Sequence, residues 1–75
     1  MDIRSNNDDL KKSIIELLSR NRYGLTIEDV ARSLNINRAT ASKYLLALEA
    51  EKFIVSRNVG AAKLHYSRGV WIYKT

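Results

Sequence analysis

The 75-residue sequence contains no cysteine and no proline, only three glycines and a single histidine. Without cysteine, neither a disulfide nor a thiolate metal site can stabilise the fold, and a lone histidine argues against a zinc site. No apolar run approaches the roughly 20 residues of a membrane span, and the N-terminus is too polar for a signal peptide. These absences predict a cytoplasmic protein with a single domain, residues 1–75, that is stabilised by apolar burial.

Acidic residues are missing from the end of the chain, because none follows Glu51. Residues 1–37 carry six basic and six acidic side chains, whereas residues 38–75 carry seven basic and two acidic ones. The whole net charge of +5 therefore falls in the second half. Charge distributed so unevenly indicates a polyanionic partner for that half. The alternative is that these lysines and arginines serve only solubility.

A first helix is predicted over residues 8–23, after a polar segment, residues 1–7, that we expect to be flexible. Asparagine and aspartate near its start can cap it, and Gly24 suits its exit. The apolar side chains that share one face are Leu10, Ile14, Leu17 and Leu18, with Ile15 at the margin. This helix offers no chemistry, and we expect it to cover the core.

Two more amphipathic helices follow in close succession, predicted over residues 26–35 and 38–51. In each, apolar residues recur at i, i+3, i+4 and i+7. These residues are Ile27, Val30, Ala31 and Leu34 in one helix, and Ala41, Tyr44, Leu45 and Leu48 in the other. Because the connection is so short, the helices must cross at a large angle, which predicts a helix-turn-helix.

Residues with capping chemistry mark the ends of these two helices. Thr26 can cap the first helix, with Asp29 completing a capping box. Asn35 can take the left-handed conformation that ends a helix, and Asn37 can cap the next one.

The first turns of the helix over residues 38–51 present short polar and basic side chains outward, namely Arg38, Thr40, Ser42 and Lys43. Short side chains allow the backbone to approach a DNA groove, while Lys43 supplies charge and the hydroxyl groups supply donors and acceptors. The alternative is that Thr40 and Ser42 are only helix-start residues. Taken together, the four residues favour contact with DNA.

A β-hairpin is predicted over residues 53–68, with its tip at residues 59–62 and with Arg57 and Lys63 on either side of the tip. Alternation in the second strand sets Leu64 and Tyr66 on one face and Lys63, His65 and Ser67 on the other. Basic side chains on a hairpin can contact a DNA backbone, or they can protect strand edges from aggregation. The last segment, residues 69–75, is apolar at Val70–Tyr73, which suits either core filling or contact with a second subunit.

Enzymatic chemistry finds no support in the sequence. Glu49 and Glu51 are two residues apart on a helix, so they do not face one another, and we expect both to be solvated. No nucleophile–base pair, metal cluster or glycine-rich phosphate loop is recognisable, and His65 has no evident partner. We expect neither an enzyme nor a bound cofactor or metal.

The order helix, link, helix, turn, helix and hairpin resembles the winged helix-turn-helix fold of DNA-binding transcription regulators, over roughly residues 10–68. Residues 27–45 are similar to the family's two-helix segment, and residues 48–54 are similar to its exit into the wing. Three family positions match in place and spacing: Ala31, Asn35 and Ala41. Where the family often has glycine before the wing, this chain has Lys52-Phe53, so a less sharp turn is expected.

The resemblance implies an α+β, mainly α, fold and sequence-specific binding of double-stranded DNA by a transcription regulator, which we expect to be a repressor. In such proteins the third helix enters the major groove and the wing contacts the adjacent backbone or minor groove. Carried over to this chain, the DNA-binding residues are Arg38, Ala39, Thr40, Ser42 and Lys43 in the helix, and Arg57, Lys63 and His65 in the wing. Small stand-alone regulators of this build are familiar from archaea and mobile genetic elements.

The resemblance also bears on partners and location. We expect a nucleoid-associated protein without a membrane partner, and either a homodimer formed through Val70–Tyr73 or a dimer formed only on DNA. An alternative function is a protein-interaction module, because winged helices also bind proteins. Its docking surface would be the Trp71 segment or the later outward face of the third helix, which carries Leu46, Ala47 and Ala50.

Overall fold

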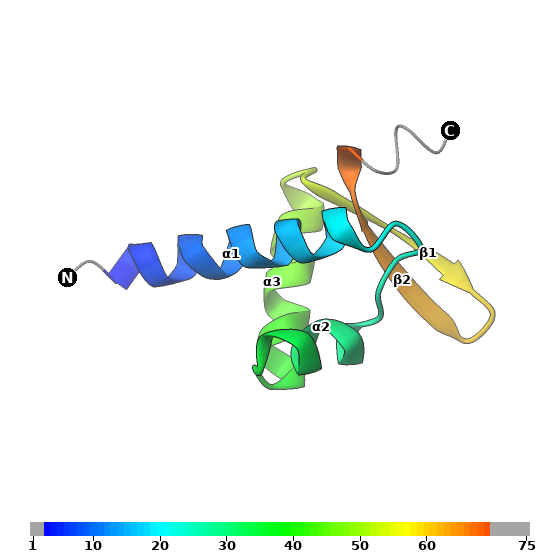
Figure 1. The fold of residues 1–75 in the computed structure, drawn as a ribbon, viewed down its shortest axis with the longest axis horizontal. Coiled ribbons are helices and arrows are strands. Elements are labelled where there is room, and N and C mark those ends of the chain that lie inside the picture. The colour runs from blue at the N-terminus through cyan, green and yellow to red at the C-terminus, as the bar shows by residue number, and fades with distance from the viewer. Residues whose placement is uncertain (1–2, 70–75) are drawn as a thin grey trace.

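The computed structural model describes the backbone of residues 3–69 and the side chains of residues 9–69. Three helices precede a two-stranded antiparallel sheet, as predicted (Figure 1). The elements are α1 (Ile3–Arg20), α2 (Ile27–Leu34), α3 (Arg38–Ala50), β1 (Ile54–Val59) and β2 (Ala62–Ser67). The predicted role of Val70–Tyr73 in a dimer lies outside the described residues.

Helix α1 is offset from its predicted range of 8–23. It begins at Ile3, so that Asn6 and Asn7 lie inside the helix instead of capping it, and its first half projects beyond the other elements (Figure 1). It ends at Arg20, where the side chain of Asn21 donates a hydrogen bond to the Leu17 carbonyl over 2.7 Å. This side-chain bond satisfies a carbonyl at the end of the helix, and the chain then turns.

The capping residues of α2 and α3 act as the sequence predicts. Thr26 and Asp29 form a reciprocal capping box at the start of α2. Asn35 ends α2 in the left-handed conformation, with φ 56°. The side chain of Asn37 accepts a hydrogen bond from the Thr40 amide over 2.7 Å at the start of α3. These local bonds fix the short connection between the two helices, and so determine where α3 begins.

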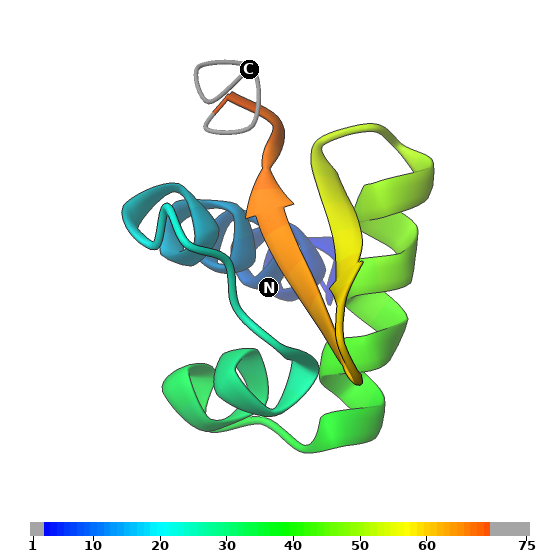
Figure 2. The ribbon, with the colours of Figure 1, turned by 90° about the vertical axis from the view of Figure 1, so that its right-hand side faces the viewer.

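The core lies between the three helices and the start of β1, with the hairpin on one side of the helices (Figure 2). Its buried members are Ile14, Leu18, Val30, Ala31, Ala41, Leu45, Leu48 and Ile54. Leu10 and Leu17 from α1 pack against this cluster while partly exposed. The helical periodicity of the sequence therefore identified the side chains from α1, α2 and α3 that form the core.

The side chains of β2 alternate between its two faces as predicted, and the polar face is the one that meets the core. Ile54 of the core pairs with Ser67, and Ser56 pairs with His65, so that His65 and Ser67 lie on the core face of the sheet. Tyr66 is buried as well, against the link that precedes α2, where Gly24 lies close to its ring. Since both faces of β2 are covered here, alternation of polar and apolar residues could not indicate which face is buried.

The exit from α3 is also tighter than expected. Lys52 adopts a left-handed conformation with φ 68°, which is the conformation that glycine favours at this position. The amide of Phe53 then donates to the Leu48 carbonyl over 3.0 Å, and the amide of Lys52 donates to that of Glu49 over 3.1 Å. Lys52 thus makes the sharp turn itself, and the expectation of a less sharp turn was wrong.

Candidate nucleic-acid interface

The outward face of the first turns of α3 is accessible. Arg38, Ala39 and Lys43 are exposed, and Thr40 and Ser42 are half-buried. Their placement follows from the burial of Ala41, Leu45 and Leu48 on the opposite face of the helix. The five residues predicted from the sequence therefore begin one helix whose orientation is fixed by its buried side and by the cap at Asn37.

Arg38 is engaged by an acidic residue that the sequence analysis did not single out. Its guanidinium lies 3.0 Å from a carboxylate oxygen of Glu28, the second residue of α2. Both side chains are largely exposed, at 68% for Arg38 and 55% for Glu28. The residues are ten positions apart and meet because the turn brings the starts of α2 and α3 together. No sequence pattern signals this pair.

A cleft of about 400 Å³ joins the start of α3 to the wing. Its lining residues come from the start of α2, from Arg38 and from the hairpin: Thr26, Ile27, Glu28, Arg38, Ala61, Ala62 and Lys63. Arg38 and Lys63, predicted separately in the helix and the wing, thus border the same hollow. Within the part of the chain whose side chains are described, neither Lys63 nor Lys43 makes an ion pair.

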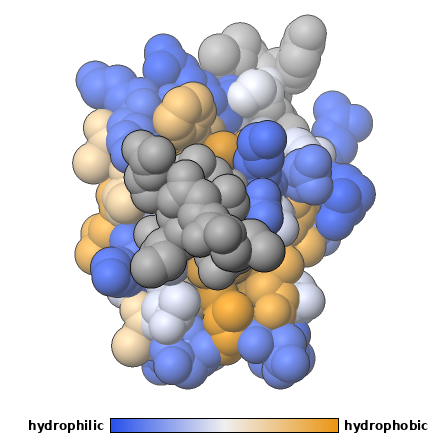
Figure 3. Space-filling view, turned by 90° about the vertical axis from the view of Figure 1, so that its left-hand side faces the viewer, coloured by the Kyte–Doolittle hydropathy of each residue, from blue (hydrophilic) through white to orange (hydrophobic). Residues whose placement is uncertain are grey.

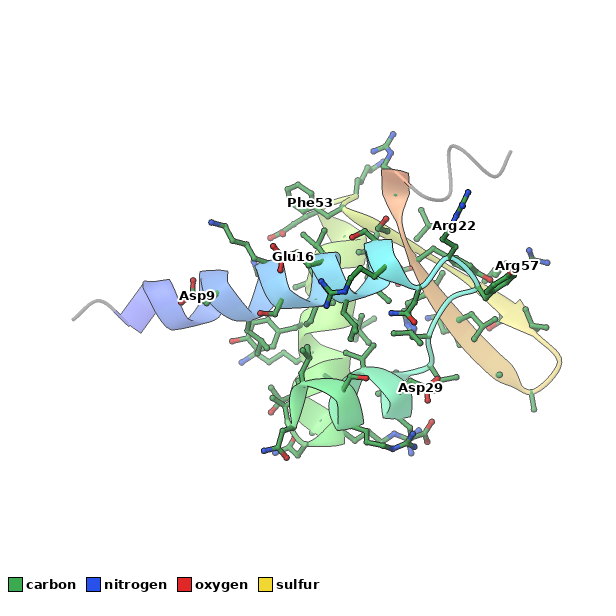
Figure 4. All side chains as sticks on the ribbon, in the orientation of Figure 1. Asp9, Glu16, Arg22, Asp29, Phe53 and Arg57 are labelled. Atoms are coloured by element: carbon green, nitrogen blue, oxygen red, sulfur yellow. The ribbon has the colours of Figure 1, made fainter. Side chains whose placement is uncertain are left out.

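Arg57 and Lys63 lie on opposite faces of the hairpin. Arg57 pairs with Leu64 across the strands, whereas Lys63 pairs with Asn58 one position on. Figure 4 shows Arg57 on the wing, at the other end of the molecule from Asp9 on α1. The two basic residues beside the tip are therefore not equivalent, because Lys63 borders the cleft and Arg57 is not among its lining residues.

His65 is enclosed rather than presented to a ligand. Only 2% of the residue is exposed, and its Nδ1 lies 3.0 Å from the Leu25 carbonyl, so Nδ1 carries the donated hydrogen. Burial lowers the pKa of His65, and the charge of Lys63 acts in the same direction, against the Leu25 carbonyl and Glu49, which raise it. A neutral, enclosed ring offers nothing to a phosphate, so His65 is removed from the predicted DNA-binding residues.

Leu25 also forms backbone hydrogen bonds with His65 in both directions, with N···O distances of 3.1 and 2.8 Å. The link before α2 thereby acts as a short third strand on the free edge of β2. His65 has a structural role, in which it fastens this link to the sheet.

Glu49 near the end of α3 and Glu51, which caps that end, both have partners, so the expectation that they are simply solvated was wrong. Glu49 accepts a hydrogen bond from the Ser56 hydroxyl over 2.7 Å, and Glu51 pairs with Lys11 over 3.1 Å. Glu49, Ser56 and His65 supply the residue types of a catalytic triad, but the serine donates to the glutamate and the histidine bonds to a main-chain carbonyl. His65 therefore does not serve Ser56 as a base, and the three residues do not form a triad.

Other features of the surface are ordinary for a small domain. Large apolar side chains are exposed singly on separate elements, with Leu46 on α3, Phe53 in the turn and Val59 on β1 among them. On the side of the molecule opposite the wing, hydrophilic and hydrophobic residues are interspersed around the residues drawn in grey (Figure 3). Among residues 3–69, no helix has the length and apolarity of a membrane span. The described side chains contain no group of three acidic, histidine or cysteine residues placed to hold a metal.

Comparison with known families decides what this arrangement is. The sequence model of the IclR helix-turn-helix domain matches residues 13–57, more than half of the chain. The chain belongs to the IclR helix-turn-helix domain family. As an IclR helix-turn-helix domain, it is a winged helix-turn-helix of the DNA-binding transcription-regulator type, and the family is not a family of enzymes. The matched range of this IclR domain covers the helix-turn-helix and part of β1, while β2 with Lys63 lies beyond it. A comparison with curated proteins gave no match.

Proposed function

We propose that this IclR-type domain binds double-stranded DNA at specific sequences and represses transcription, with α3 in the major groove and the wing on the adjacent backbone or minor groove. The observation that carries the proposal is the shared cleft. Arg38 at the start of α3 and Lys63 on the wing border the same hollow, so that one DNA backbone could contact both. The outward face of α3 that continues from Arg38 then points toward a groove with Ala39, Thr40, Ser42 and Lys43.

The side chains support different parts of such a contact. Lys43 and Lys63 supply charge for phosphates, and Arg57 can contact the backbone from the other face of the wing. Ala39 is small and exposed, which allows the helix backbone to approach base edges or a thymine methyl group. Thr40 and Ser42 add hydroxyl groups that can bond to phosphates or bases.

Selection of bound sequences from random duplex DNA is the direct test. We expect enrichment of a defined motif, and an enriched site with two symmetric halves would support the proposed homodimer on DNA. A promoter that carries the enriched site should then lose transcription in the presence of the protein. Enrichment of no motif would contradict sequence-specific binding, and increased transcription would contradict repression.

Substitutions in α3 test the proposed contact surface. Lys43→Ala should weaken binding to the selected site by roughly tenfold, and Arg38→Ala should weaken it as well. Both residues are exposed, so the thermal unfolding midpoint should stay close to that of the wild type. Lys12→Ala, which removes the same charge from an exposed position on α1, serves as the matched control. Equal affinity in all three variants would place the DNA elsewhere.

A second candidate function has one observation in its favour. Leu46 lies on the later outward face of α3 with 60% of its surface exposed, beyond the side chains proposed for DNA. An apolar side chain at that position could dock a protein partner. Recovery of a defined partner after nuclease treatment, lost in Leu46→Glu and combined with no affinity for duplex DNA at low salt, would decide for this function.

A further inference from the structure

Glu28 of α2 and Arg38 of α3 form an ion pair that joins the starts of the two helices. Glu28 lies in the first turn of α2, and one of its carboxylate oxygens is 3.0 Å from the guanidinium of Arg38. A phosphate oxygen would take up the same position against this guanidinium. The free protein thus already holds Arg38 in the kind of bond that DNA would offer.

The surroundings of Glu28 make its charge unusual. It is the only acidic residue among the seven that line the cleft, and two of the others, Arg38 and Lys63, are basic. A phosphate that approached these two cations would meet the Glu28 carboxylate in the same cleft. Because both side chains are largely exposed, the pair is weak, so DNA can break it.

We infer that Glu28 acts as an internal competitor with DNA phosphate: it masks Arg38 in the free protein and weakens sequence-independent binding to duplex DNA. This inference rests on the proposed DNA-binding function and adds a means of setting its strength. While Glu28 is paired with Arg38, its carboxylate offsets the positive charge that the guanidinium presents to DNA. The pair therefore adds little to the net positive charge that displaces counterions from the phosphates.

Replacement of Glu28 should change both the affinity for DNA and its dependence on salt. In Glu28→Gln, Arg38 presents its full positive charge to a phosphate, so up to one more counterion is released. Affinity for a duplex of mixed sequence should rise roughly two- to fivefold, and the slope of log affinity against log salt should steepen by up to about 0.9. The measurement is fluorescence anisotropy with a labelled duplex in about 50 to 200 mM KCl.

Two further variants make the test specific to Arg38. Glu16→Gln makes the same charge change on α1 and should leave the salt slope at its wild-type value (Figure 4). In an Arg38→Ala background, Glu28→Gln should no longer steepen the slope, because the masked cation is gone. A thermal midpoint near that of the wild type verifies that Glu28→Gln is folded. Glu28→Ala, which also removes the carboxylate, should give the same salt slope as Glu28→Gln.

The outcomes separate the inference from the function on which it rests. A wild-type protein with a flat salt response would overturn DNA binding itself, and the inference with it. A salt-dependent wild type with an unchanged slope in Glu28→Gln would overturn the inference alone. A steeper slope that persists in the Arg38→Ala background would also overturn it, because Glu28 would then repel phosphates directly instead of masking Arg38.

Discussion

Gly24 lies in the link before α2, where the ring of Tyr66 from β2 leaves no space for a side chain. Its φ is +91°, and a Cβ built on it would lie 2.8 Å from Cζ and 2.9 Å from Cε2 of Tyr66. Gly24→Ala should therefore lower the free energy of unfolding by about 2–4 kcal/mol, through backbone strain and overpacking together. Urea denaturation measures this loss.

The matched control is Gly60→Ala at the hairpin tip. Gly60 also has a positive φ, +61°, but nothing lies within 4 Å of its added Cβ. This variant should lose only about 1 kcal/mol, the cost of the backbone conformation. Equal losses at the two positions would contradict the close contact of Gly24 with Tyr66.

His65 gives the fold a pH dependence of defined sign. Because burial lowers its pKa below the usual 6.5, the unfolded chain takes up a proton at a higher pH than the folded protein does. The free energy of unfolding should be at its full value above about pH 6.5 and should fall as the pH falls through 6.5 toward the folded pKa. Urea midpoints measured from about pH 8 to about pH 5 follow this change, since carboxylates titrate lower.

His65→Asn is the control for this effect, because the asparagine amide can still donate to the Leu25 carbonyl. His65 is the only histidine in the chain, so its replacement should remove the pH dependence in this range, whatever the absolute stability of the variant. A wild-type midpoint that does not change over the range would show that the ring is accessible to protons when folded.

At the scale of elements, the cap at Asn37 both begins α3 and lies next to Arg38, so stability and DNA affinity can be separated there. Asn37→Ala loses the hydrogen bond from the Thr40 amide and should cost about 1 kcal/mol of stability. Asn37→Ser and Asn37→Asp should both restore the cap. Only Asn37→Ser should also keep the DNA affinity, because aspartate adds a negative charge at the proposed interface.

Thermal unfolding of the three variants measures the loss and recovery of the cap, and duplex binding measures the effect of the added charge. If Asn37→Asp binds DNA as well as Asn37→Ser does, the start of α3 does not approach phosphates.

The same element scale separates the two wing cations. Lys63 borders the cleft with Arg38, whereas Arg57 lies on the other face of the hairpin. Lys63→Ala should therefore weaken duplex binding more than Arg57→Ala does, although each removes one positive charge. Anisotropy titrations with the selected duplex compare the two; a greater loss in Arg57→Ala would mean that the backbone follows the opposite face of the wing.

For the molecule as a whole, stability depends on one small core without a disulfide. Leu48 is completely buried in the last turn of α3, and Leu48→Ala should cost about 3 kcal/mol. In a domain of this size that loss lowers the thermal midpoint by roughly 10–20 °C. Leu46→Ala, two residues earlier and 60% exposed, should change the midpoint little. Calorimetry of both variants tests whether α3 is oriented as described.

The sequence alone determined the three helices and the buried side of each, and for α2 and α3 also the caps, because these follow from interactions within a few residues. Thr26, Asn35 and Asn37 act through local hydrogen bonds, and apolar residues at helical spacing need only one buried side. The same local regularity identified the outward residues of α3 and the winged helix-turn-helix class, to which the matching IclR family belongs.

Tertiary structure alone decided how these elements meet. The burial of His65 depends on Leu25, forty residues earlier, which pairs with the edge of β2. The contact of Glu28 with Arg38 depends on the angle between two helices, and the opposite placement of Arg57 and Lys63 depends on strand register. None of these has a local signature, since each is a contact between segments that only the packed core brings together.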